Sequence, residues 1–123
     1  MSAFKVSVVA RNPKDESRET LPVEALVDTG SELSWLPSEL LHRAGIVPRR
    51  KRAFATATQQ IVEREVGFAI VAAEGYETID EVVFALPSDA TLLGVRSIEG
   101  FGVLVDNIGH RFVARTTIVA AAR

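Results

Sequence analysis

The sequence predicts an all-β fold with one or two short helices, and three observations support this prediction. Most apolar residues lie in short segments that alternate with polar residues or are rich in β-branched residues, as in strands. Polar turns, several of them containing glycine or proline, separate these segments, and only two short stretches have helical spacing. The 123 residues contain no internal repeat and no long linker. We therefore expect residues 1–123 to form a single domain.

The chain begins with segments typical of a β-hairpin. Residues 4–9 alternate as a strand does, the polar residues 11–17 are typical of a loop, and residues 21–27 are predicted as the returning strand. Residues 37–45 then predict a short helix, because a proline suits its first turn and a glycine its end.

The later elements are predicted from the same signals. Residues 49–71 form a long β-like segment interrupted by polar residues, which predicts a hairpin with its tip near Gln59. The following segments are predicted as a strand over 77–86, a short helix over 95–101, a hairpin joining 103–105 to 111–113, and a β-branched tail over 116–119.

The amino-acid composition excludes some kinds of functional site and makes some kinds of partner unexpected. The chain has no cysteine, which excludes disulfides, thiolate metal sites and a cysteine nucleophile. Its formal net charge of −2 gives no electrostatic reason to expect nucleic acid or an anionic membrane as a partner. No segment is typical of a secretory signal or of a membrane span. We expect a cytoplasmic protein without a cofactor.

The tripeptide Asp28-Thr29-Gly30 is the motif that carries chemistry. Aspartate and glycine are also common turn residues, and this tripeptide occurs by chance in on the order of a few per cent of chains of this size. Its surroundings strengthen the functional interpretation. An apolar strand over 23–27 leads into it, Ser31 follows it, and a second apolar segment occupies 33–37.

This block resembles the retropepsin-like aspartic peptidases. That family has a second element, two apolar residues and a glycine before a short helix, which is similar to Leu92-Leu93-Gly94 and the residues through Phe101. Between the two elements the family has a β-hairpin flap, and the hairpin predicted at about 53–66 occupies that place. The resemblance covers about residues 4–115, and it implies a retropepsin-like acid protease barrel that acts as a homodimer.

The chemistry explains why the motif would need a second carboxylate. Cleaving a peptide without a metal or a nucleophilic side chain requires an activated water and a polarised carbonyl group. Two adjacent carboxylates that share one proton supply both, because like charges in contact do not both ionise cheaply. Since the chain has one Asp-Thr-Gly, a homodimer would bring two copies of Asp28 together on a two-fold axis.

The resemblance also assigns roles to other residues. Thr29 would brace the two loops across the interface, Gly30 would allow close approach of the substrate, and Ser31 would hydrogen-bond a carboxylate oxygen. The peptide or protein substrate is expected to contact the following residues: Ser31, Thr58, Gln59, Gln60 and Leu93.

The sequence departs from the retroviral pattern in three places. Glu32 stands where those members have aspartate, and Arg96 comes one residue late after the glycine. A Glu32–Arg96 ion pair and two separately solvated charges are equally compatible with this spacing. The predicted flap also lacks a run of glycines, which implies a stiffer or differently bonded lid.

Several features have other interpretations. The basic run Arg49-Arg50-Lys51-Arg52 is expected to be a solvated segment leading into the hairpin, with nucleic-acid contact as the alternative. His42 and His110 are expected to face solvent, and two histidines are too few for a three-histidine metal site. Trp35 is expected in the core, with a pocket wall as its alternative. For the whole chain, the alternative function is an inactive dimerisation or peptide-binding module.

Overall fold

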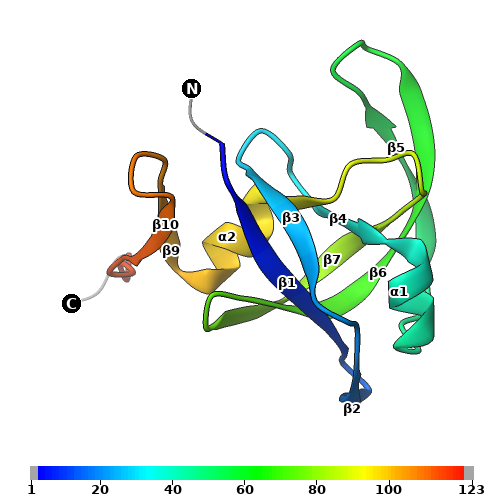
Figure 1. Ribbon diagram of the computed structural model, residues 1–123, viewed down its shortest axis with the longest axis horizontal. Coiled ribbons are helices and arrows are strands. Elements are labelled where there is room, and N and C mark those ends of the chain that lie inside the picture. Colours follow the sequence, from blue (N-terminus) through cyan, green and yellow to red (C-terminus); the bar gives the residue numbers. More distant parts are fainter. Residues whose placement is uncertain (1–2, 121–123) are drawn as a thin grey trace.

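The computed structural model describes residues 3–120, and strands make up most of this part of the chain (Figure 1). The strands are β1 (Lys5–Asn12), β2 (Asp15–Glu19), β3 (Val23–Asp28), β4 (Ser34–Pro37), β5 (Arg50–Ala55), β6 (Ile61–Ala73), β7 (Tyr76–Ala85), β8 (Leu92–Gly94), β9 (Val103–Asp106) and β10 (Arg111–Ala114). The helices in the described residues are α1 (Ser38–Arg43) and α2 (Val95–Phe101), and neither is long and apolar enough to cross a membrane. The prediction of an all-β fold with short helices is confirmed.

A closed barrel forms the centre of the fold. Within residues 3–120 the strands follow the order β1-β3-β8-β4-β7-β6, and β6 pairs back onto β1. Most neighbours are antiparallel, but β3 pairs with β8 and β4 with β7 in parallel. Because β3 and β8 run in the same direction, their carboxyl ends meet at one edge of the barrel. Asp28 lies there, beside Gly94.

Side chains buried at alternate positions of the strands fill the core of the barrel. The side chains of β1 are buried at every second position near its start, which agrees with its sequence pattern. In β7 the pattern changes from alternation to continuous burial from Asp80 onward, because this half of the strand is covered on both faces. The residues with the largest fully buried side chains include Phe84, Leu33, Leu41, Leu93, Val8 and Val82.

The first hairpin differs from its prediction. Residues 11–17 were expected to form a loop, but β1 continues to Asn12 and β2 begins at Asp15. Every side chain of β2 is exposed, so its polar composition is compatible with a strand. Asn12 fixes the turn, because its side chain accepts the Lys14 N–H at 2.8 Å and donates to the carbonyl of Ala44 at 3.1 Å. The loop prediction is therefore wrong.

The C-terminal hairpin is present, but the tail after it is not a strand. β9 and β10 form an antiparallel pair, as the sequence predicted. Val103 lies opposite Ala114 at one end, and Asp106 lies opposite Arg111 at the other. Residues 116–119 have β-branched side chains but lie outside any strand, and Ile118 is 87% exposed. Strand propensity alone does not form a strand, because the backbone groups need a partner to pair with.

Replacing Phe84 with alanine is expected to lower the free energy of unfolding by about 3–5 kcal/mol, since Phe84 is almost completely buried in β7. Ile79→Ala on the same strand is the matched control. Ile79 is 65% exposed, so its variant should change stability by no more than about 0.5 kcal/mol. Chemical denaturation would measure both, and equal losses would contradict the description of the core.

Candidate active site

The end of β3 holds Asp28 in a tight turn. The Gly30 N–H donates to Asp28 Oδ1 at 2.9 Å, and the Ser31 N–H donates to the Asp28 carbonyl oxygen at 3.1 Å. Side-chain acceptance of this kind is typical of aspartate in turns, and here it also fixes the carboxylate. The Asp28 side chain is half-buried, so it remains accessible to a ligand.

The backbone of β8 passes directly against the segment that enters β4. A Cβ atom added to Gly94 would lie 2.9 Å from the backbone nitrogen of Ser34 and closer still to the carbonyl group of Leu33. Gly94 has φ −89° and ψ 170°, a conformation open to most residues. Glycine is therefore required here by space alone. This contact explains why the Leu92-Leu93-Gly94 element ends in glycine.

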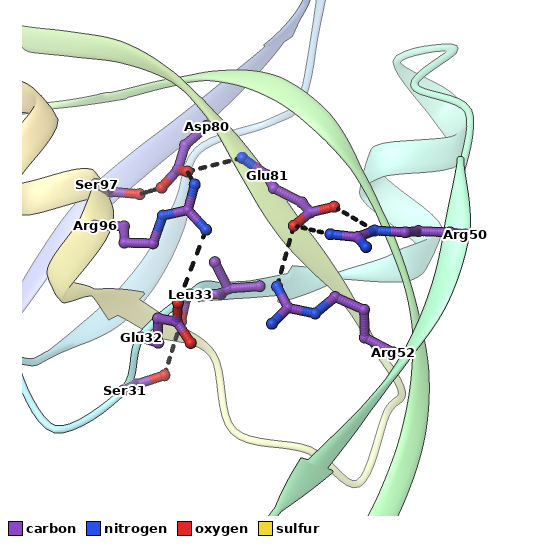
Figure 2. Close-up of polar contacts among 9 residues, drawn as sticks. All are labelled: Ser31, Glu32, Leu33, Arg50, Arg52, Asp80, Glu81, Arg96 and Ser97. Carbon is purple, nitrogen blue, oxygen red and sulfur yellow. Dashed lines mark hydrogen bonds and ion pairs between the residues drawn. The ribbon is translucent and has the colours of Figure 1, made fainter.

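The first turn of α2 binds the loop that follows Asp28. The Val95 N–H donates to the Ser31 carbonyl at 2.8 Å, and the Arg96 N–H donates to the Glu32 carbonyl at 3.1 Å. Both donors belong to a helix N-terminus, where N–H groups have no acceptor within the helix. The Ser31 hydroxyl in turn donates to the carbonyl oxygen of Leu33 at 2.7 Å (Figure 2). The loop is thus fixed at several points.

The Glu32–Arg96 ion pair is present, at a long separation of 3.9 Å between Nη1 and Oε2. Arg96 Nη2 also lies 3.7 Å from Oδ1 of Asp80, so this guanidinium bridges two carboxylates (Figure 2). Because Glu32 and Arg96 are both exposed to water, their mutual attraction contributes little to stability. Asp80, in contrast, is buried.

A groove of about 740 Å³ has Asp28 in its lining. The other lining residues come from the loop after β3, from β4, from the β5–β6 hairpin, and from β8 with the loop before it. This volume is within the range of ligand pockets in proteins. Asp28 is therefore a half-buried carboxylate facing a space that can hold a ligand.

Trp35 forms part of the wall of this groove. Its ring meets the edge of Phe54 with centroids 5.1 Å apart, and both residues line the groove. Trp35 also packs on a small buried cluster that includes Leu33 and Val83. The expectation of a purely core position is therefore corrected. An indole is large enough to reach the core with one part and the groove with another.

The β5–β6 hairpin projects from the body of the fold, with its tip at residues 56–60 (Figure 1). Part of this hairpin lines the groove. The tip is closed by hydrogen bonds of 2.8 Å from the Thr56 N–H to the Gln60 carbonyl and from the Gln59 N–H to the Thr56 carbonyl. Thr56 and Ala57 line the groove. Thr58, Gln59 and Gln60 are exposed and lie outside the groove lining, so their contact with substrate stays a prediction.

A buried carboxylate anchors the base of the hairpin. Arg50 donates two hydrogen bonds to Glu81, at 3.0 and 3.1 Å, and Arg52 donates a third at 3.1 Å (Figure 2). The hydrogen bonds from Arg50 hold the pKa of Glu81 below its usual range, against the opposing effect of burial. Arg49 stacks on Phe68, 5.3 Å from the ring centroid. Three of the four basic residues in the run thus have partners within the fold.

A second ion pair joins the hairpin to the loop before β8. Arg64 donates to both carboxylate oxygens of Asp89, at 2.7 and 2.9 Å, and both side chains are largely buried while lining the groove. Asp89 also accepts the Leu86 N–H at 2.8 Å. Bidentate hydrogen bonding of this kind is among the strongest interactions between an arginine and a carboxylate. It fixes one part of the groove wall.

The remaining predicted residues lie as follows. Thr29 and Gly30 are exposed beside Asp28, whereas Leu93 is completely buried, so the proposed role of Leu93 in substrate binding stays a prediction. His42 and His110 are both exposed, as expected. Among residues 3–120, no group of three or more His, Cys, Asp or Glu side chains is placed to hold a metal ion.

Sequence reasoning missed two groups of charged residues, one in the lining of the groove and one on β7. Arg64 and Asp89 are far apart in the chain, and no local spacing indicates that they pair. Asp80 and Glu81 did carry a signal, because two adjacent carboxylates come directly before the apolar run at residues 82–85 of the same strand. Charges in such positions require partners, and these two find theirs on α2 and β5.

Gly94→Ala is expected to prevent stable folding or to lower the free energy of unfolding by several kcal/mol, since backbone atoms cannot move aside as side chains do. Gly75→Ala is the control, because Gly75 has φ +84° but open space around its Cβ direction. That variant should lose only about 1–2 kcal/mol, the cost of a left-handed conformation. Similar losses in both variants would contradict the proposed close approach.

Glu81→Gln is expected to lower the free energy of unfolding at pH 7 by about 1.5–3 kcal/mol, because it weakens buried, charge-assisted hydrogen bonds. The folded pKa of Glu81 is lowered, so its stabilisation is complete above the unfolded value of about 4.3 and is lost as pH falls through the folded value. The difference between wild type and variant should therefore shrink below about pH 4. Glu77→Gln, on an exposed position of β7, is the control, and a pH-independent difference for Glu81→Gln would be the contrary result.

Comparison with known proteins agrees with the geometry. No curated protein matches the chain. The sequence model of a family described as Aspartyl protease matches residues 16–97, which is well over half of the chain. The matched part includes Asp28-Thr29-Gly30, the β5–β6 hairpin and the Leu92-Leu93-Gly94 element. The chain therefore belongs to the aspartyl protease family, among its retropepsin-like members.

Proposed function

We propose that the protein is an aspartic endopeptidase in which two copies of the chain each supply one Asp28. The observation that carries this proposal is the half-buried Asp28 carboxylate, which the Gly30 N–H holds at 2.9 Å in the lining of a groove of about 740 Å³. Membership of the aspartyl protease family supports the reaction class.

The proposed chemistry needs both carboxylates. One Asp28 is ionised and removes a proton from a bound water as that water attacks the peptide carbonyl carbon. The other Asp28 is protonated and donates to the carbonyl oxygen. This division of labour is general for aspartic proteases as a class, and it arises because two adjacent carboxyl groups share one proton. The two apparent pKa values belong to the pair.

The dimer follows from the number of motifs in the chain. The 123 residues contain Asp-Thr-Gly once, so a single copy has one carboxylate of the required kind. A two-fold axis beside Asp28 would bring an identical carboxylate to the first. The exposed Thr29 is then positioned to contact the partner, in agreement with the bracing role that the family resemblance implies.

The proposed substrate is an extended peptide or a protein segment. Such a segment would lie in the groove below the β5–β6 hairpin and would pair its backbone as an added strand. Thr56 and Ala57 of the hairpin already line the groove, which supports a role for the hairpin as a lid over the substrate. A cytoplasmic location, a single domain and the absence of cofactors, nucleic acid and membrane as partners belong to this proposal.

Asp28→Asn is expected to abolish peptide cleavage without preventing dimer formation, because the two side chains have nearly the same shape. Wild-type and variant chains would be mixed, allowed to exchange subunits, and assayed with a peptide library. If both carboxylates are needed, an equal mixture retains about one quarter of the wild-type activity, since only dimers of two wild-type chains act.

Two results would contradict the proposal. An equal mixture that retains half of the activity would mean that each chain acts alone. A wild-type protein that forms dimers and binds peptides but cleaves none would instead support the inactive peptide-binding module. Analytical ultracentrifugation of Asp28→Asn would serve as the control, because it measures whether the variant still forms dimers.

A further inference from the structure

Asp80 is a buried carboxylate that the proposed reaction does not use. It lies in β7, is 7% exposed, and is absent from the lining of the groove. Its side chain points toward α2 and meets Ser97 and Arg96 of that helix (Figure 2). A buried charge is expensive unless its partners compensate for the loss of water.

A continuous series of hydrogen bonds leads from Asp80 to the edge where Asp28 lies. Asp80 Oδ2 accepts from the Ser97 hydroxyl at 3.0 Å, and Ser97 Oγ lies 2.8 Å from Ser34 Oγ. Ser34 Oγ accepts the Gly94 N–H at 2.9 Å. Ser34 and Ser97 are completely buried, so these bonds do not compete with water.

The direction of these bonds follows from counting protons. Each serine hydroxyl has one proton, and that of Ser97 is used on the ionised Asp80. Ser97 must therefore accept from Ser34, whose own oxygen accepts from Gly94. All donors point the same way, from the Gly94 N–H to the Asp80 carboxylate. Such a series is mutually polarising and strengthens each of its members.

Gly94 is the point at which this series reaches the catalytic loop. It lies beside Asp28 in the parallel pairing of β3 and β8. The Asp80 carboxylate also faces the side chain of Arg96, and the backbone N–H of Arg96 donates to the Glu32 carbonyl at 3.1 Å. Asp80 is thus connected indirectly to the segment after Asp28 in two ways. One connection runs through the serine hydroxyl groups, and the other runs through Arg96 in the first turn of α2.

We infer that Asp80 is a positioning residue for Asp28, acting through Ser97, Ser34 and the Gly94 N–H. The inference rests on the proposed function, since it concerns the placement of the proposed catalytic carboxylate. It assigns to Asp80 no contact with substrate or with the reacting atoms.

The surroundings of Asp80 make this role sensitive to pH. Burial raises the pKa of Asp80, and the hydrogen bonds from Ser97 and from the Glu81 N–H oppose this effect only in part. The charged groups that face it are Arg96 from α2, with Glu32 attached, and the neighbouring Glu81 on its own strand. Arg96 favours the ionised form of Asp80 and Glu81 disfavours it.

Protonation of Asp80 would weaken the series. If the proton sits on Oδ2, Ser97 has to reverse its bond, and one buried hydroxyl proton of the series is left without an acceptor, which is unfavourable. If the proton sits on Oδ1, Ser97 still donates to Oδ2, but the bond loses the contribution of the negative charge. The Gly94 N–H would then be held less firmly, and Asp28 with it.

The first test follows the Gly94 amide by NMR as pH changes, in ¹⁵N-labelled protein that carries Asp28→Asn, so that titration of the neighbouring Asp28 does not contribute. We expect its chemical shifts to titrate with an inflection above the ordinary aspartate value of about 3.9. Asp80→Asn should remove this inflection, whereas Glu77→Gln, on an exposed position of the same strand, should leave it unchanged. An inflection that persists in Asp80→Asn would overturn the inference, and this readout does not depend on any peptidase activity.

The second test measures cleavage kinetics. Asp80→Asn is expected to lower kcat by about ten- to a hundredfold with little change in KM, because misplacement of a reacting group affects the chemical step. Ser97→Ala should have a similar effect, Ser97→Thr should restore most of the activity, and the double variant should lose no more than either single variant. The acid side of the pH profile should also shift in Asp80→Asn.

The outcomes separate this inference from the proposed function. If the wild type cleaves peptides and Asp80→Asn retains its kcat and pH profile, the positioning role is wrong while the peptidase proposal stands. If the wild type cleaves nothing, the peptidase proposal fails, and the Gly94 titration alone decides whether Asp80 controls this amide. If Asp80→Asn fails to fold, the kcat values of Ser97→Ala and Ser97→Thr are compared instead. A kcat of Ser97→Ala equal to that of the wild type would overturn the positioning role.

Discussion

The contact of Gly94 with the backbone of Leu33 and Ser34 is the constraint on which the site depends. It brings β8 against the segment that leaves the Asp28 loop, with no room for a side chain between them. Parallel pairing of β3 with β8 then places Asp28 beside Gly94. The first turn of α2 follows at once and binds the same loop through its free N–H groups. Backbone geometry, rather than side-chain packing, thus fixes the carboxylate.

Two adjacent carboxylates on β7 connect this geometry to the rest of the groove. Asp80 turns toward α2 and the Asp28 loop, while Glu81 binds the arginines at the base of the β5–β6 hairpin (Figure 2). One strand therefore supports both the proposed catalytic loop and the proposed lid. Their pKa values shift in opposite directions, because burial dominates at Asp80 and hydrogen bonds from Arg50 dominate at Glu81. The two supports thus respond differently to acid.

The sequence was informative wherever a local pattern determined the structure. Asp28-Thr29-Gly30 and the Leu92-Leu93-Gly94 element each lie within a few residues, and the β5–β6 hairpin follows from its turn. Contacts between distant segments were not predictable: Arg64 meets Asp89, and Ser34 meets Ser97, only because of how the barrel closes. The loop expected at 11–17 failed for a related reason, since β2 is held by pairing with β1 and not by its composition.

The central claim is that two copies of Asp28 form one site, and a crystal structure of the protein with a peptide-like inhibitor tests it most directly. The inhibitor should carry a hydroxyl group in place of the peptide bond to be cleaved. The account predicts two chains related by a two-fold axis, with their Asp28 carboxylates within hydrogen-bond distance of each other and of that hydroxyl. An inhibitor bound to a single chain, or to a dimer whose Asp28 residues lie far apart, would contradict it.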